Sequence, residues 1–334
     1  MKILYIPVAK KIKENNLKNI FICFIYNIKI ILKNFLLKKK ITTSTQGYIE
    51  SAIRMNAKIF ELPFNYCIFF SKFLNLYFDG IFINWKFTNN RKDKKIYDKL
   101  IKLSKKFNIK KVIVDTTDLS YHLIRQDVLE KYDFVIKREK HKSITNEKYL
   151  TTMLPLKLIE YKVQKKNEFI EWPKIGRLKP NIHNKYDVFF SGTSNNKRRT
   201  ELVNLLKNSN IKFYGGLKRI PFNDYLKTIY NSSINLAIAG VGGAEFTFRH
   251  LEILSCCSFL MCHEEINKLD LPLPLKDGVH FVSYRNNEDV LEKINFYLKN
   301  DHLRKKIAQN GRNILVEHYS PQKHGYLILK KIFY

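Results

Sequence analysis

Alternating strand and helix patterns constrain the fold of this chain more than any other feature. In the first half, short apolar β-prone segments are separated by longer segments with helical spacing. The β-prone segments cover residues 2–8, 58–63, 77–84, 110–118 and 132–137. Such alternation predicts a parallel sheet that is covered by helices on both faces.

The second half repeats the same alternation. Its strand patterns cover residues 186–193, 211–216, 234–240, 259–264 and 280–284. A polar stretch with two prolines and no periodicity, residues 171–185, precedes them and is typical of an interdomain linker. We therefore expect an α/β fold with two Rossmann-like domains, 1–180 and 181–320. Residues 321–334 predict a closing helix that crosses back to the first domain, because little of the second sheet remains for it to cover.

The charge balance has two explanations. The 334 residues include 60 Lys and Arg against 30 Asp and Glu, a formal net charge of +30. A polyanion partner, such as nucleic acid or an anionic membrane surface, would explain this excess. Codon usage in an AT-rich genome would also explain it, since most of the excess is lysine.

The segment at about 15–40 is the strongest candidate for a membrane contact. Its apolar residues recur at helical spacing, Lys29 and Lys33 share another face, and it ends in three lysines. A basic amphipathic helix of this kind lies at a membrane interface or packs on the sheet. No signal peptide or membrane-spanning stretch is recognisable. The five cysteines lie in apolar segments, which favours reduced thiols and a cytoplasmic protein, peripheral on the inner face of the membrane.

Two loops of the second half place cations where parallel strands end, which is where open α/β sheets bind ligands. In "SGTSNNKRR", Gly192 permits a close turn, and Arg198 stands near a helix N-terminus. Cations are unfavourable there unless an anion is bound, although a solvated basic surface is the alternative. In "YGGLKR", Lys218 follows two glycines.

The loop "AGVGGAEFTFRHLEIL" is the most informative. Gly242 and Gly243 precede a helix whose free backbone N–H groups could bind a phosphate. Arg249 and Glu252, three residues apart, share one helix face. The arginine would neutralise a diphosphate and the carboxylate would accept the hydroxyls of a ribose. A plain salt bridge between the two is the alternative.

The same loop also suggests a dinucleotide-dependent oxidoreductase, because it begins like the G-x-G-x-x-G pattern. Glu245 stands at the third glycine position, and the motif lies in the third strand–helix unit, which disfavours NAD binding. A nucleic-acid-binding protein rests on the net charge alone, and no motif supports it. We therefore expect no nucleic acid partner.

The second half resembles the C-terminal domain of GT-B glycosyltransferases, and the CgeB-like (spore-maturation-protein-like) group of the group 1 family in particular. The segments "DVFFSGTSNNKRRTELVNLL" and "FRHLEILSCCSFLM" carry this resemblance, together with the tail from residue 277. The resemblance implies that Glu252 holds the ribose of a nucleotide sugar. It implies that Arg249, Arg198 and, more weakly, Lys218 face the diphosphate.

The first half resembles the acceptor-side domain of such enzymes. If the enzyme inverts, a base there would deprotonate the acceptor hydroxyl, and Asp115, Asp118 and His122 are the candidates. Retaining relatives often have a Glu-x7-Glu pair, but only six residues separate Glu245 from Glu252, so the role of Glu245 stays open. Cys257 replaces the glycine of the family's L-x-x-G segment.

The resemblance implies a transfer of a sugar from a nucleoside-diphosphate donor to a hydroxyl of a glycan or lipid-linked acceptor, in cell-surface polysaccharide biosynthesis. The sequence has no D-x-D motif, and we expect neither a metal ion nor a cofactor, with cations and helix N-termini neutralising the leaving group.

Overall fold

A computed structural model describes a large part of the chain. The described residues are 2–6, 58–61, 79–84, 101–102, 108–115, 123–151, 179–181, 183–194, 196–240, 246–318 and 321–334. The predicted amphipathic segment at 15–40 lies outside them.

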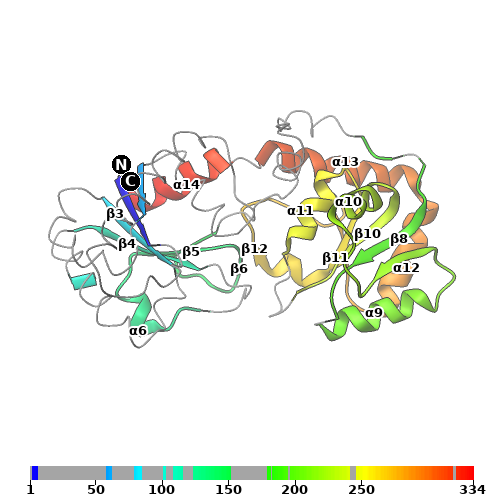
Figure 1. Cartoon of the computed structure of the whole chain (residues 1–334), viewed down its shortest axis with the longest axis horizontal. Helices are drawn as coiled ribbons and strands as arrows, with labels where there is room; N and C mark the ends of the chain where they lie inside the picture. Colours follow the sequence, from blue (N-terminus) through cyan, green and yellow to red (C-terminus); the bar gives the residue numbers. More distant parts are fainter. Residues whose placement is uncertain are drawn as a thin grey trace, which may run out of the picture.

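The described strands of the first half form one parallel six-stranded sheet (Figure 1). Its strands are β1 (Lys2–Ile6), β2 (Lys58–Glu61), β3 (Gly80–Asn84), β4 (Lys110–Asp115), β5 (Phe134–Lys137) and β7 (Tyr149–Thr151). They lie in the order β2-β1-β3-β4-β5-β7. A short helix, α6 (Gln126–Leu129), connects β4 to β5.

The described strands of the second half form a parallel five-stranded sheet. They are β8 (Tyr186–Ser191), β9 (Phe213–Gly216), β10 (Ser232–Ala237), β11 (Leu260–His263) and β13 (Val282–Tyr284). Their spatial order is β13-β11-β10-β8-β9. In both sheets the first strand of the half therefore lies between the second and the third, which is the doubly wound order that turns back on itself at the first strand.

Helices cover both faces of the second sheet. They are α9 (Lys197–Lys207), α10 (Phe222–Tyr230), α11 (Phe248–Ser255), α12 (Asn287–Lys299) and α13 (Asp301–His318), and the 3₁₀ turn η4 (Glu264–Lys268) follows β11. Alternate residues of β8 point to opposite faces, as in any strand. Phe189 packs with α10 and α11, whereas Val188 and Phe190 pack with residues of α9, α12 and α13. This arrangement confirms the expected α/β class with two Rossmann-like sheets.

The last helix, α14 (Pro321–Phe333), lies on the first sheet and not on the second (Figure 1). Ile328, Leu329 and Ile332 are buried in one cluster with residues of β1, β3 and β4. Phe333 packs so closely on β3 that a Cβ atom added at Gly80 would lie 2.7 Å from its ring.

A small two-stranded sheet joins the two halves. β6 (Lys140–His141) pairs antiparallel with β12 (Leu269–Asp270). The Nζ atom of Lys140 lies 2.8 Å from the carboxylate of Asp270, and the backbone N–H of Lys142 donates to the carbonyl of Lys268. Among the helices that the structure describes, none combines the length and the hydropathy needed to cross a membrane.

Candidate active site

The carboxyl ends of β8 and β10 are where the second sheet is expected to bind a ligand. The two strands are neighbours in space, but their following helices, α9 and α11, pack on opposite faces. The loops leaving such a pair diverge, and the space between them is the usual ligand site of an open α/β sheet. Among the described residues, four of the predicted donor-binding residues lie in the segments that leave these strands, namely Gly192, Arg198, Arg249 and Glu252.

Two arginines meet at this point. The guanidinium groups of Arg199 and Arg249 lie 5.8 and 4.9 Å from the ring centroid of Phe190. Arg199, on α9, donates to the carbonyl of Ile238 at 3.0 Å, and Arg249, on α11, donates to the carbonyl of Ser191. Both arginines thus tie a helix to the end of a strand.

Electrostatics at this point favour an anion. The pKa of Arg199 is lowered to about 10, first by burial and second by the positive charge of Arg249. A bound anion would offset this repulsion, since two cations held in a poorly solvated site favour a counter-charge. The Nε atom of Arg249 is buried and has no hydrogen-bond partner among the described residues.

The predicted cation Arg198 and its neighbour Arg199 have different environments. Asn196 caps α9 by accepting the N–H of Arg198 at 2.9 Å, and its side chain also donates to the carbonyl of Gly240. Arg199 is buried, whereas Arg198 is half-buried. The pKa of His263, at the end of β11, is lowered first by burial and second by the positive charge of Arg198. Arg198 therefore lies on the side of the sheet towards β11.

Glu252 is buried on α11, one turn after Arg249. It is 6% exposed, and its Oε2 atom accepts the hydroxyl of Tyr225 at 3.0 Å. Tyr225 comes from α10 and was not predicted from the sequence. The pKa of Tyr225 is raised well above its ordinary value, first by burial and then by the charge of Glu252, while Arg249 acts in the opposite direction.

The other predicted donor-site residues in the described part lie in the loops after β8 and β9. A Cβ atom added at Gly192 would lie 2.8 Å from the Phe190 ring, so no larger residue fits there without a shift. Lys218 is exposed, with its Nζ atom 5.9 Å from the Tyr214 ring centroid. Its backbone carbonyl accepts the hydroxyl of Ser191 at 2.7 Å. Gly242 and Gly243 lie outside the described residues.

The start of α11 is fixed by a capping box. The Nδ1 atom of His250 accepts the backbone N–H of Thr247 at 3.1 Å, in the way a Glu or Gln does at this position. His250 is fully buried, and its pKa is lowered to about 3, chiefly by burial and then by Arg249 and Arg138.

The first domain reaches the same helix end through a charged segment. Glu139, which follows β5, accepts the backbone N–H of Phe246 at 3.0 Å. It also accepts a hydrogen bond from Arg138, and both side chains are buried. These two residues were not predicted from the sequence, although the run "KREKHK" directly after an apolar strand was a visible signal.

The predicted acceptor-side base Asp115 ends β4 in a buried ion pair. Its Oδ2 atom lies 2.9 Å from the Nζ atom of Lys137 on the neighbouring strand, and both side chains are almost fully buried. This contact engages one of the two carboxylate oxygens of Asp115. The candidates Asp118, His122 and Glu245 lie outside the described residues.

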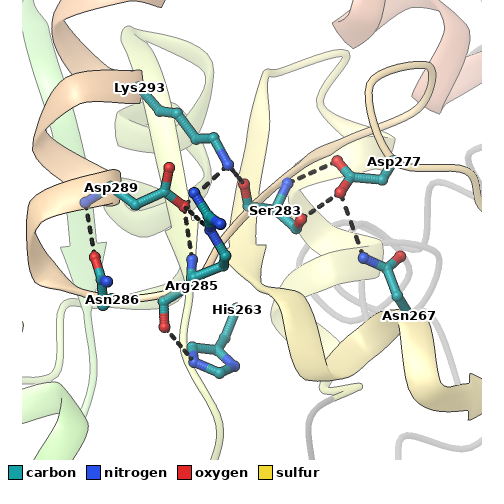
Figure 2. Close-up of polar contacts among 8 residues, drawn as sticks. All are labelled: His263, Asn267, Asp277, Ser283, Arg285, Asn286, Asp289 and Lys293. Atoms are coloured by element: carbon teal, nitrogen blue, oxygen red, sulfur yellow. Dashed lines mark hydrogen bonds and ion pairs between the residues drawn. The ribbon is translucent and has the colours of Figure 1, made fainter.

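A polar network fixes the edge of the second sheet beside this site (Figure 2). The Asp289 carboxylate of α12 accepts the backbone N–H of Arg285 and the ammonium of Lys293. The Asp277 carboxylate accepts both the N–H and the hydroxyl of Ser283, and so ties the proline-containing loop to β13. His263, at the end of β11, contacts the Arg285 carbonyl at 3.0 Å.

Comparison with known proteins identifies the second half. The glycosyl transferase-like family matches residues 198–328. This part of the chain is thus similar to a glycosyl transferase-like domain. The matched range contains Arg198, Lys218, Arg249 and Glu252. The expected enzyme class, a glycosyltransferase, is confirmed by this domain, and the CgeB-like group is not.

Solved structures extend the likeness over both domains. An α-glucosyltransferase in complex with UDP and a 13-mer DNA aligns over 100% of this chain and 99% of its own, with 9% identity and a TM-score of 0.54. Anabaena HepE in complex with UDP aligns over 99% of each chain, with 12% identity and a TM-score of 0.51. The chain has the GT-B fold. A search of curated proteins finds no match. Neither comparison supports the oxidoreductase, or a nucleic-acid-binding protein without enzymatic activity.

Proposed function

We propose that this glycosyl transferase-like chain transfers a sugar from a nucleoside-diphosphate donor to a hydroxyl group of a glycan or lipid-linked acceptor. The observation that carries the proposal is that the guanidinium groups of Arg249 and Arg199 lie against the same Phe190 ring at the switch point of the second sheet, with Glu252 one turn after Arg249 on α11. Both solved structures named above contain UDP, and UDP-sugars are therefore the first donors to test.

The diphosphate would lie against the cations. Cleavage of the bond between the sugar C1 and the diphosphate oxygen leaves negative charge on the diphosphate, while the acceptor oxygen bonds to C1. Arg249 and Arg198 would stabilise this charge, with Lys218 as an exposed auxiliary cation and the amides of Gly242 and Gly243 as further donors. With these three cations neutralising the leaving diphosphate, we propose that transfer needs no divalent metal ion.

The nucleoside would lie towards α11, with the ribose hydroxyls on Glu252. A carboxylate accepts hydrogen bonds from both hydroxyls of a ribose, and a buried one does so without competing water. The loop tied down by Asp277 would then form the wall beside the base.

If the enzyme inverts, a base from the first domain would remove the acceptor proton. Asp115 is engaged by Lys137, so Asp118 and His122 become the first candidates among the three. Glu245, which precedes α11 in the sequence, is a candidate for contacts to the sugar.

The acceptor class follows from the basic segment at 15–40, which we propose as a contact to an anionic membrane surface. An enzyme held there would reach lipid-linked glycans on the cytoplasmic face. A net charge of +30 would also attract DNA, so DNA serves as the comparison acceptor.

A transfer assay tests the proposal. The purified chain is incubated with UDP-, GDP-, ADP- and dTDP-sugars, with lipid-linked glycan extract or duplex DNA as acceptor, with EDTA present. We expect one donor to be consumed with the glycan extract, and the Glu252→Ala variant to be at least about a hundredfold slower. Transfer to DNA alone would overturn the acceptor class. Consumption of no donor with either acceptor would overturn the proposed function.

A further inference from the structure

The contact between Tyr225 and Glu252 goes beyond the donor-binding roles assigned above, and its interpretation rests on the proposed function. Tyr225 lies on α10 and Glu252 on α11. The two residues are 27 positions apart, and their hydrogen bond of 3.0 Å is buried. A contact between two helices thus determines where the carboxylate lies.

Both partners are held rigidly. Tyr225 is 7% exposed and Glu252 is 6% exposed. The Tyr225 ring packs against Phe189 of β8 with the ring centroids 5.7 Å apart, and both belong to the cluster between the sheet and the two helices. The ring therefore fixes the position of its hydroxyl, since side chains in a packed core occupy single rotamers.

The direction of the hydrogen bond matters for the carboxylate. A raised pKa keeps the Tyr225 hydroxyl protonated throughout the neutral range, so it serves as a donor to Oε2. A carboxylate has about four lone-pair sites and keeps capacity for further donors after this one is used. The tyrosine thereby fixes the plane of the Glu252 carboxylate in which two ribose hydroxyls would be accepted.

We propose that Tyr225 is a positioning residue that holds the Glu252 carboxylate in the orientation required to recognise the ribose of the donor, and so determines the preference for ribose over deoxygenated sugars. It acts through Glu252 and needs no contact with the donor itself. Arg249 lies one turn before Glu252 on the same helix. The orientation of the Glu252 carboxylate therefore also sets where the ribose lies relative to the diphosphate.

The test compares UDP with 2′,3′-dideoxy-UDP by calorimetric titration of the full chain. The wild-type protein should bind UDP at least about tenfold more tightly, because the dideoxy ligand lacks the two hydroxyls that would donate to the Glu252 carboxylate. The Tyr225→Phe variant, which keeps the ring in the core, should lose most of this preference through weaker UDP binding, with dideoxy-UDP binding unchanged. In a Glu252→Ala background, Tyr225→Phe should have no further effect on the preference.

Tyr230→Phe is the matched control, because it removes a hydroxyl from the other end of α10, where that hydroxyl contacts the Lys179 carbonyl. It should leave the ribose preference unchanged. If Tyr225 had only a structural role, Tyr225→Phe would weaken the binding of both ligands equally and leave the preference for UDP unchanged. That result would overturn the inference and leave the proposed function intact. If the wild-type chain binds no nucleoside diphosphate, the proposed function falls, and the inference falls with it.

Discussion

Cys257 has a backbone conformation that side chains rarely adopt. Its φ angle is +52°, and it follows the last residue of α11 and its C-cap, Cys256. The N–H of Ser258 donates to the carbonyl of Ile253, and the N–H of Cys257 to that of Leu254. These two hydrogen bonds form a Schellman motif, whose left-handed position prefers glycine. A glycine at this position, as in the L-x-x-G segment, would adopt the left-handed conformation without strain. Cys257 adopts it with a side chain, at a cost in stability.

A pair of substitutions isolates this strain. Both Cys257→Gly and Cys257→Ala remove the sulfur, so the difference between them reports the backbone alone. We expect the glycine variant to be more stable than the alanine variant by about 1 kcal/mol in urea-induced unfolding. At Cys256, where φ is −80°, the order should reverse. Equal stabilities of the two Cys257 variants would contradict the account.

Single residues also show the limit of prediction from sequence. Arg198 was expected to stand near an anion at the start of a helix, but the pattern does not tell whether Arg198 or its neighbour Arg199 is buried. The structure buries Arg199 against Ile238, because the third residue of α9 turns inward. Asp115 was expected to face an acceptor, and its buried partner Lys137 lies on another strand, 22 residues away. Pairings at that separation depend on strand order, which residue spacing does not contain.

At the scale of elements, α11 couples its capping box to pH. His250 is neutral in the folded chain, because its pKa is about 3 there, whereas the ordinary pKa of a solvated histidine is 6.5. The unfolded state thus binds the additional proton. The stability from this group is complete above pH 6.5 and is lost as pH falls below it, by about 1.4 kcal/mol per pH unit.

A His250→Gln variant tests this coupling. Glutamine at the same position of the box still accepts the backbone N–H of Thr247 but does not titrate. Between about pH 7.5 and 5.0, we expect the unfolding free energy of the wild-type chain to fall by about 2 kcal/mol more than that of the variant. His302→Gln, at an exposed position of α13, serves as control and should keep the wild-type dependence. Identical pH dependence of the wild-type chain and His250→Gln would refute the role of His250.

The longer elements were predictable and the shortest were not. The apolar runs of β4, β8 and β10 and the helical spacing of α9 and α12 are strong patterns, because each buries a full face or stripe. β6 and β12 have two residues each, and their pairing joins segments about 130 positions apart. Nothing in so short a stretch specifies a strand before the partner is in place.

At the scale of the whole molecule, the same strand order in both sheets places two switch points in one chain. The described part links the halves by β6 and β12, by Glu139 at the start of α11, and by α14, which returns to the first sheet. Glu139 and Arg138 thus bring charged groups of the first domain to the helix that carries Arg249 and Glu252. An acceptor held by the first domain would meet the donor beside these residues.

Titration of UDP into the purified chain tests whether this switch point binds a nucleoside diphosphate. We expect UDP to bind at one site per chain, and at least about tenfold more weakly to the Arg249→Ala and Glu252→Ala variants. Arg219→Ala, an exposed arginine of the loop after β9, should bind as the wild-type chain does. Loss of binding in that control alone, or unchanged affinity in Arg249→Ala and Glu252→Ala, would contradict the account.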